Sequence, residues 1–205
     1  MALSLACTLM LTAGSQVPAP LATLERVAED IDDAVVAGDW TKVERLEVEG
    51  RRAVHRLETD GAASHRAAEA LDRARAATRA RDALGTRVAA NTLADAVVDL
   101  FEPLKPSVPI SVMRLDVLLR TVDLAAIAAR PGEARVAIDR VWAIWNGLAA
   151  KAPVAGSPVE GSFNTQLAAI ERTAKDNDFL ALHSAAAAAL DGVDELEARF
   201  TTRNP

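Results

Sequence analysis

The best-placed pair of metal-ligating side chains in this sequence is His55 and Glu58. On a helix, residues three positions apart lie on one face, so the imidazole and the carboxylate could hold one metal ion together. Arginines at positions 51, 52 and 56 surround the pair and would repel a cation. The sequence therefore favours a solvated pair, and a site for an iron-type or other hard cation at His55 and Glu58 is the alternative that we keep.

The segment His55-Arg56-Leu57-Glu58 resembles the HxxE motif of the imelysin family, whose members are periplasmic helical proteins linked to iron uptake. The resemblance covers four of 205 residues, and the second half of that family's signature is not found in the chain. It implies an iron-type site at His55 and Glu58, and it does not assign the chain to the family.

A second group of candidate ligands is the acidic stretch at residues 25–33. Glu25, Glu29 and Asp33 recur every four residues and share one helical face. Such a face attracts a hard cation such as calcium, but one straight helix cannot surround an ion with six or more oxygens. The arginine-rich segment 66–87 carries the opposite charge, and we expect it to pair with the acidic helix in the same bundle.

Asp116, Arg120 and Asp123 form the polar set best suited to line a groove for a ligand or partner. They fall at i, i+4 and i+7 on one helical face, and Arg114 is nearby. Two carboxylates beside one guanidinium can form an ordered hydrogen-bonded network. The network would either fix the register of packed helices or line a binding groove, and the sequence favours the structural role.

Trp142 and Trp145 stand three residues apart in a chain with only 3% aromatic residues. They share a helical face, which Val141 and Leu148 extend, and two indoles bury a large apolar area. We expect the pair to anchor the second half of the chain against the 115–119 region. The alternative is that one indole stays exposed on a groove and contacts a ligand or partner.

No catalytic motif is recognisable. The sequence has no nucleophile elbow, glycine-rich phosphate loop, cysteine pair or Ser/His/Asp arrangement. We expect a non-enzymatic protein that binds a protein partner or a small ligand, with no cofactor other than the metal ion considered above. The net charge of −6 argues against nucleic acid as the main partner.

Helical periodicity runs through nearly the whole chain after Pro20. Apolar residues recur at three- and four-residue spacing, and no segment shows the alternation of a strand. Gly38-Asp39 predicts a helix end followed by a helix start, and Ser157 with Glu160 forms a capping box. We predict an all-α fold: an antiparallel helical bundle of αα-hairpins in a single domain over residues 20–205, with a proline-rich crossing at about 103–109.

The first twenty residues carry no charge, and an apolar run at 2–11 is followed by small residues and Pro-Ala-Pro. This pattern is typical of a secretory signal peptide, although the usual basic residues before the run are missing. We predict a cleaved signal peptide at 1–19 and a periplasmic or secreted protein, with a lipid anchor on Cys7 as the alternative. We expect its partner in the periplasm, and no stable membrane span in the mature chain.

Overall fold

The computed structural model describes residues 17–57, 61–151 and 154–201. Within these ranges the chain forms eight α-helices and one short 3₁₀ helix, and it contains no strand. The α-helices are α1 (Ala19–Val36), α2 (Trp40–Val54), α3 (Ala62–Arg79), α4 (Ala83–Phe101), α5 (Ile110–Ile127), α6 (Pro131–Ala149), α7 (Pro158–Asp176) and α8 (Phe179–Thr201). The prediction of an all-α helical bundle is confirmed.

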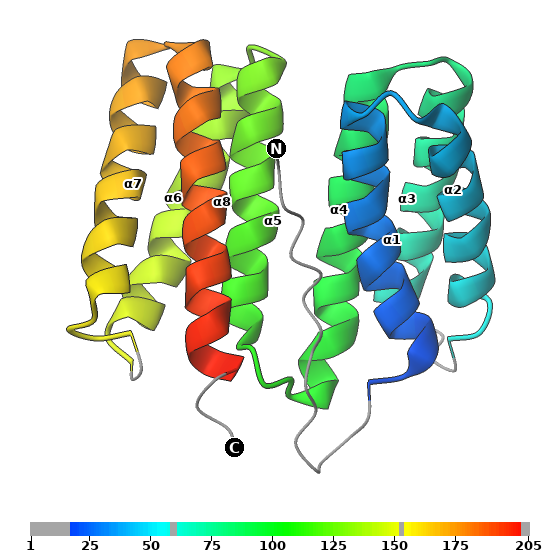
Figure 1. Cartoon of the computed structure of the whole chain (residues 1–205), viewed down its shortest axis with the longest axis horizontal. Helices are drawn as coiled ribbons and strands as arrows, with labels where there is room; N and C mark the ends of the chain where they lie inside the picture. Colours follow the sequence, from blue (N-terminus) through cyan, green and yellow to red (C-terminus); the bar gives the residue numbers. More distant parts are fainter. Residues whose placement is uncertain (1–16, 58–60, 152–153, 202–205) are drawn as a thin grey trace.

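The helices form two four-helix bundles that lie side by side (Figure 1). In the N-terminal bundle α1 and α3 each pack against both α2 and α4, and in the C-terminal bundle α5 and α7 each pack against both α6 and α8. Each bundle has its own apolar core, and Met113 borders both cores. The region that we expected to form one domain thus contains two bundles, in contact through α4 and α5.

Capping residues mark two of the helix boundaries that the sequence predicted. Gly38 takes a positive φ of 71°, and the Asp39 side chain accepts a hydrogen bond of 2.9 Å from the backbone N–H of Lys42. In the capping box, Ser157 Oγ accepts from the Glu160 N–H, and the Glu160 carboxylate accepts from the N–H of Gly156, one residue before the position that the motif predicts.

Helices α3 and α4 are separated by a short turn at residues 80–82. Arg81 takes a positive φ of 55°, and the Asp82 carboxylate accepts a 2.9 Å hydrogen bond from the Gly85 N–H. The Arg81 guanidinium also lies 5.1 Å from the centre of the Trp40 ring, so it covers the aromatic residue that begins α2.

The proline-rich crossing connects the two bundles. It begins with the 3₁₀ helix η1 (Glu102–Leu104) and continues to Pro109, which precedes α5. Lys105 takes a left-handed conformation there, and the Val108 side chain is buried. Among the residues in the described ranges, no helix combines the length and apolar character that crossing a membrane requires.

Candidate functional site

Helix α5 lies at the junction between the two bundles and presents different residues to different neighbours. Leu115, Leu119 and Val122 are buried in the C-terminal core. Asp116, Arg120 and Asp123 interact with charged groups of α1, α4 and α8. Val117, Leu118 and Thr121 line a groove that α4 and α6 complete. The junction therefore has a charged face and an opposite surface that we call the apolar groove.

Four side chains on the charged face connect the two bundles. Arg87 of α4 donates from Nε to the Asp32 carboxylate of α1 at 2.7 Å, and its Nη2 lies 3.4 Å from Asp123 of α5. His183 of α8 contacts the other oxygen of Asp123 through Nδ1. Only 8% of the Asp123 side chain is exposed, and Arg87 and His183 are the two side chains that contact its carboxylate. We call this set the interbundle clamp. Of the arginine-rich segment, Arg87 pairs with the acidic first helix as expected, whereas Arg66 pairs with Asp99 of α4 and Arg81 lies near Glu44 of α2.

Asp116 and Arg120 form a second pair, one turn away from the clamp. Arg120 Nε donates to the Asp116 carboxylate at 2.8 Å. Desolvation would lower the pKa of Arg120, but the charges of Asp116, Asp32 and Glu29 outweigh it and raise the pKa. Of the predicted set, Asp116 and Arg120 are thus brought together, whereas Asp123 contacts Arg87 and His183 instead.

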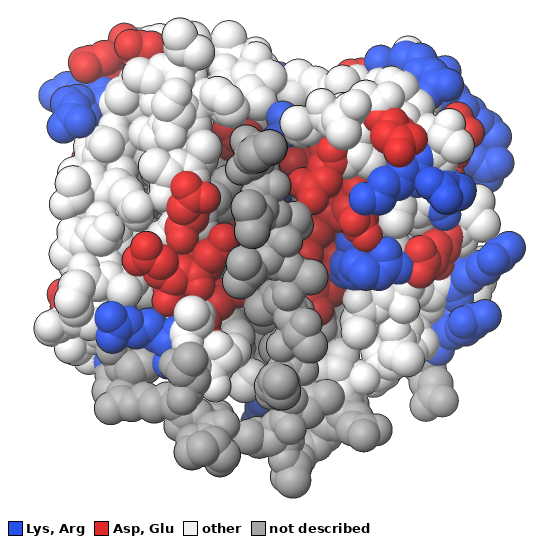
Figure 2. Space-filling model, viewed as in Figure 1, with Lys and Arg blue, Asp and Glu red and all other residues white. Residues whose placement is uncertain are grey.

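Carboxylates from both bundles gather near this pair, and Figure 2 shows acidic side chains on both bundles where the bundles face each other. Desolvation raises the pKa of Glu25 to about 7, with smaller contributions from Glu29 and from Glu197 of α8. Desolvation and the charge of Asp116 likewise raise the pKa of Glu29 to about 7, although the Glu29 side chain is exposed. The two glutamates therefore take up protons near neutral pH.

Among the residues that the structure describes, no three His, Cys, Asp or Glu side chains lie close enough together to hold a metal ion. The helix α2 ends at Val54, and the exposed His55 is its C-cap, so His55 lies at the end of the helix and not within it as the predicted spacing assumed. Glu58 itself lies outside the described residues.

The apolar groove lies between α4, α5 and α6 and has a volume of about 490 Å³. Val88 on α4 and Val136 on α6 form its walls and are 41% and 54% exposed. Asn91 Nδ2 donates to the carbonyl oxygen of Val117 and to Thr121 Oγ1, and it thereby connects α4 to α5 at the groove. The Asn91 Oδ1 atom is buried and has no hydrogen-bond partner among the described residues.

Charged residues line the rim of the groove, and most of them are paired. Arg130 contacts Glu133 at 3.3 Å, and Asp95 lies 3.8 Å from Arg114. Arg140 of α6 is exposed and has no carboxylate partner in the part of the chain that the structure describes. The groove thus offers an apolar surface with one unpaired guanidinium at its edge.

The remaining predicted residues lie elsewhere. Arg114 pairs with Asp99 of α4 at 2.5 Å and does not join Asp116 and Arg120. Trp145 is buried, its ring centre lies 4.5 Å from that of Phe163, and its Nε1 donates to Asn164 at 2.7 Å. Trp142 is only partly buried and packs against the same core. Trp145 is therefore the main anchor of the C-terminal bundle, and neither indole lines the apolar groove.

Sequence reasoning missed the apolar groove altogether. One available signal was Val136, which falls outside the buried stripe of Ala134, Ala137, Ile138 and Val141 on α6. A valine off the buried face of an amphipathic helix suggests an exposed apolar surface, but it does not show which helix lies opposite.

Comparison of the chain with protein-family models, with curated proteins and with solved structures found no match. The function is therefore inferred from the geometry of the junction itself.

Proposed function

We propose that this chain is an exported, non-enzymatic binding protein whose ligand is a small amphipathic carboxylate held in the apolar groove. The observation that carries the proposal is the groove itself: an open apolar surface between two bundles, with one unpaired arginine at its rim. Ligand sites in proteins are concave, mostly apolar and often located between domains, with a few polar groups that orient the ligand.

The size of the groove favours a small molecule over a protein partner. Its volume of about 490 Å³ falls within the range of roughly 300–1,000 Å³ that is usual for small-molecule pockets. Sixteen residues line it. A stable protein partner would cover roughly 20–30 residues on this side, so most of its contacts would have to lie beyond the groove.

The charge at the rim favours an anionic head group. Among the described arginines at or near the rim, Arg140 has no carboxylate partner, whereas Arg130 and Arg114 already have carboxylates of this chain beside them. A guanidinium binds a carboxylate through two parallel hydrogen bonds, which orients the ligand as well as holding it. The apolar tail would then lie along α5 between Val88 and Val136.

Calorimetric titration of the purified protein with decanoate, decanol and decyltrimethylammonium tests this proposal. We expect decanoate to bind most tightly, and Arg140→Gln to weaken its binding by about tenfold or more, the effect of losing a charge-assisted hydrogen bond. Arg135→Gln is the matched control, because Arg135 is an exposed arginine of α6 that does not line the groove. Equal affinity for decanoate and decanol, or no binding of either, would contradict the proposal.

Export is part of the proposal, and it is supported by the uncharged, apolar start of the sequence. The mature N-terminus can be located by mass spectrometry after expression in a Gram-negative host. Cleavage near residue 19 supports a periplasmic or secreted protein, and a lipidated Cys7 would make it membrane-anchored instead. Elemental analysis of the same material addresses the metal alternative, since a stoichiometric metal that is lost in His55→Ala would favour it.

A further inference from the structure

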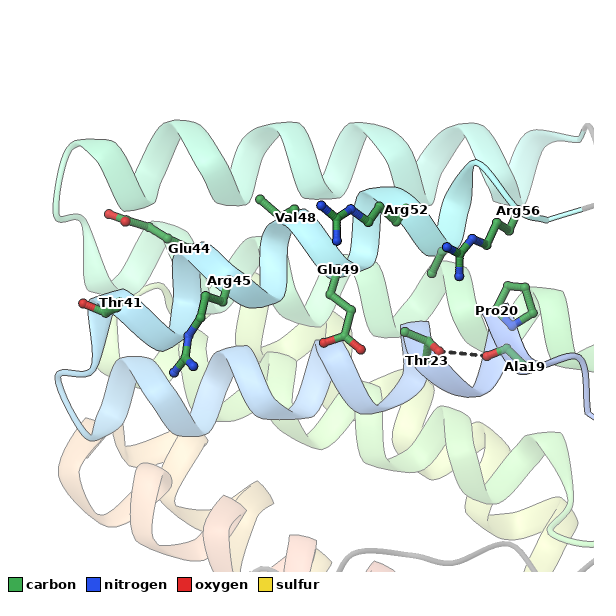
Figure 3. Close-up of a pocket in the computed structure, with 11 residues that line it drawn as sticks. Ala19, Pro20, Thr23, Thr41, Glu44, Arg45, Val48, Glu49, Arg52 and Arg56 are labelled. Carbon is green, nitrogen blue, oxygen red and sulfur yellow. Dashed lines mark hydrogen bonds between the residues drawn. The ribbon is translucent and has the colours of Figure 1, made fainter.

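We propose that the groove between α1 and α2 is a second binding site, and that it takes a small anion with two or more phosphate groups. This groove has a volume of about 790 Å³ and is lined by the start of α1, the outer face of α2 and the turn that follows α2 (Figure 3). It shares no lining residue with the apolar groove, so it goes beyond the function proposed above.

Three arginines give this groove its charge. Arg45 and Arg52 lie seven residues apart, two turns along one face of α2, and Arg56 follows in the turn after the helix. Figure 3 shows Arg45 reaching from α2 toward α1, with Arg52 and Arg56 farther along the same open side. None of the three has an ion-pair partner in the part of the chain that the structure describes.

The carboxylates in the groove do not compensate these arginines, because each already has another cation beside it. Glu49 pairs with Arg26 of α1, and Glu44 lies 3.8 Å from Arg81. Elsewhere on the same helix, Arg51 pairs with Asp72. What distinguishes Arg45, Arg52 and Arg56 from other exposed arginines is that they line one groove, where an anion from outside can contact more than one guanidinium.

The type of charge indicates the class of anion. Guanidinium groups bind phosphate oxygens in a bidentate manner, and arginine is the preferred residue for this purpose. The backbone positions of Arg45 and Arg52 are separated by about 10 Å along the helix axis, so each guanidinium can contact a different phosphate of one anion. A linear anion with several phosphates matches this spacing. The concave shape favours a free molecule over the flat surface of a membrane.

Titration of the full-length protein with sodium tripolyphosphate, at low and at physiological salt, is the direct test. We expect binding that weakens as salt increases, and a loss of at least about tenfold in the triple variant Arg45→Gln/Arg52→Gln/Arg56→Gln. The control is Arg73→Gln/Arg79→Gln/Arg172→Gln, which removes three exposed arginines outside the groove and changes the net charge equally. Both variants should keep the circular dichroism spectrum and the decanoate affinity of the parent protein.

Two results would overturn the proposal. One is that tripolyphosphate does not bind; if the protein then sediments with phosphatidylglycerol vesicles, the groove is a membrane contact. The other is that the control variant loses as much affinity as the groove variant, since the effect would then come from net charge alone. Because the variants retain the apolar groove, neither result would affect the decanoate experiment.

Discussion

The charged face and the apolar groove lie on two sides of α5 and are formed by neighbouring residues of that helix. They differ in whether their side chains already have partners within this chain. On the charged face Asp116 and Asp123 contact cations of this chain, so the protein supplies its own partners. On the opposite side Val117 and Leu118 line a groove whose valine walls remain open. The comparison suggests that the charged face holds the bundles together, whereas the apolar groove is the surface left for a ligand.

The strongest test of this contrast is Asp123→Ala. Removal of one member of a buried charge network leaves the others uncompensated, so we expect the free energy of unfolding to fall by about 3–5 kcal/mol. Urea denaturation followed by circular dichroism measures this change. Asp116→Ala is the control, because the Asp116 side chain is 26% exposed and pairs within α5, where such a pair contributes about 0.3–0.5 kcal/mol. Equal losses in the two variants would show that the clamp has no special role.

A smaller effect is expected at the apolar groove, from Asn91→Ala. This change removes two hydrogen bonds between α4 and α5, each worth about 0.5–1.5 kcal/mol, and it also removes the buried Oδ1 atom that has no partner. Because these effects oppose each other, we expect a net loss of about 1 kcal/mol in urea denaturation. Thr92→Ala lines the same groove, but its hydroxyl bonds only within α4, so it should stay within about 0.5 kcal/mol of the parent protein. A loss at Asn91 as large as at Asp123 would remove the distinction between the two surfaces.

The sequence predicted what depends on local spacing. The helix boundary at Gly38 and Asp39 follows from the conformations and side chains of neighbouring residues. The Asp116–Arg120 pair could be predicted for the same reason, because side chains four residues apart lie next to each other on a helix.

The partners of Asp123 could not be predicted in this way. Arg87 and His183 are separated from it by 36 and 60 residues, and only the packing of α4 and α8 around α5 brings them together. The His55–Glu58 site depended on a helix that continues past Val54, and no cap residue marked the earlier end. Trp142 and Trp145 also show the limit of a simple spacing rule. Their spacing places both side chains on one helical face, but only Trp145 is fully buried, and it contacts Phe163 of α7. The periodicity of one helix does not show which other helix packs against it.

The last and smallest effect concerns two carboxylates of the charged face that have no ion-pair partner among the described residues, Glu25 and Glu29. Glu25 and Glu29 have a pKa of about 7 in the folded chain, above the value of 4.5 that applies to an unperturbed glutamate. The charged groups that act on them come from α1, α5 and α8: Asp30, Asp33, Asp116, Arg120 and Glu197.

Since the folded state binds these protons more tightly, their contribution to stability is fully present below pH 4.5 and is lost as the pH rises through about 7. The double variant Glu25→Gln/Glu29→Gln cannot lose protons there, so its stability relative to the parent protein should increase between pH 5 and pH 8. Glu29 is exposed, and solvent and salt will reduce the effect below those of the two substitutions above. Thermal unfolding at a series of pH values measures the difference, with Glu171→Gln on the surface of α7 as the control. If the double variant and the control show the same pH dependence, the charged face is compensated after all, and the contrast between the two sides of α5 is weaker than proposed.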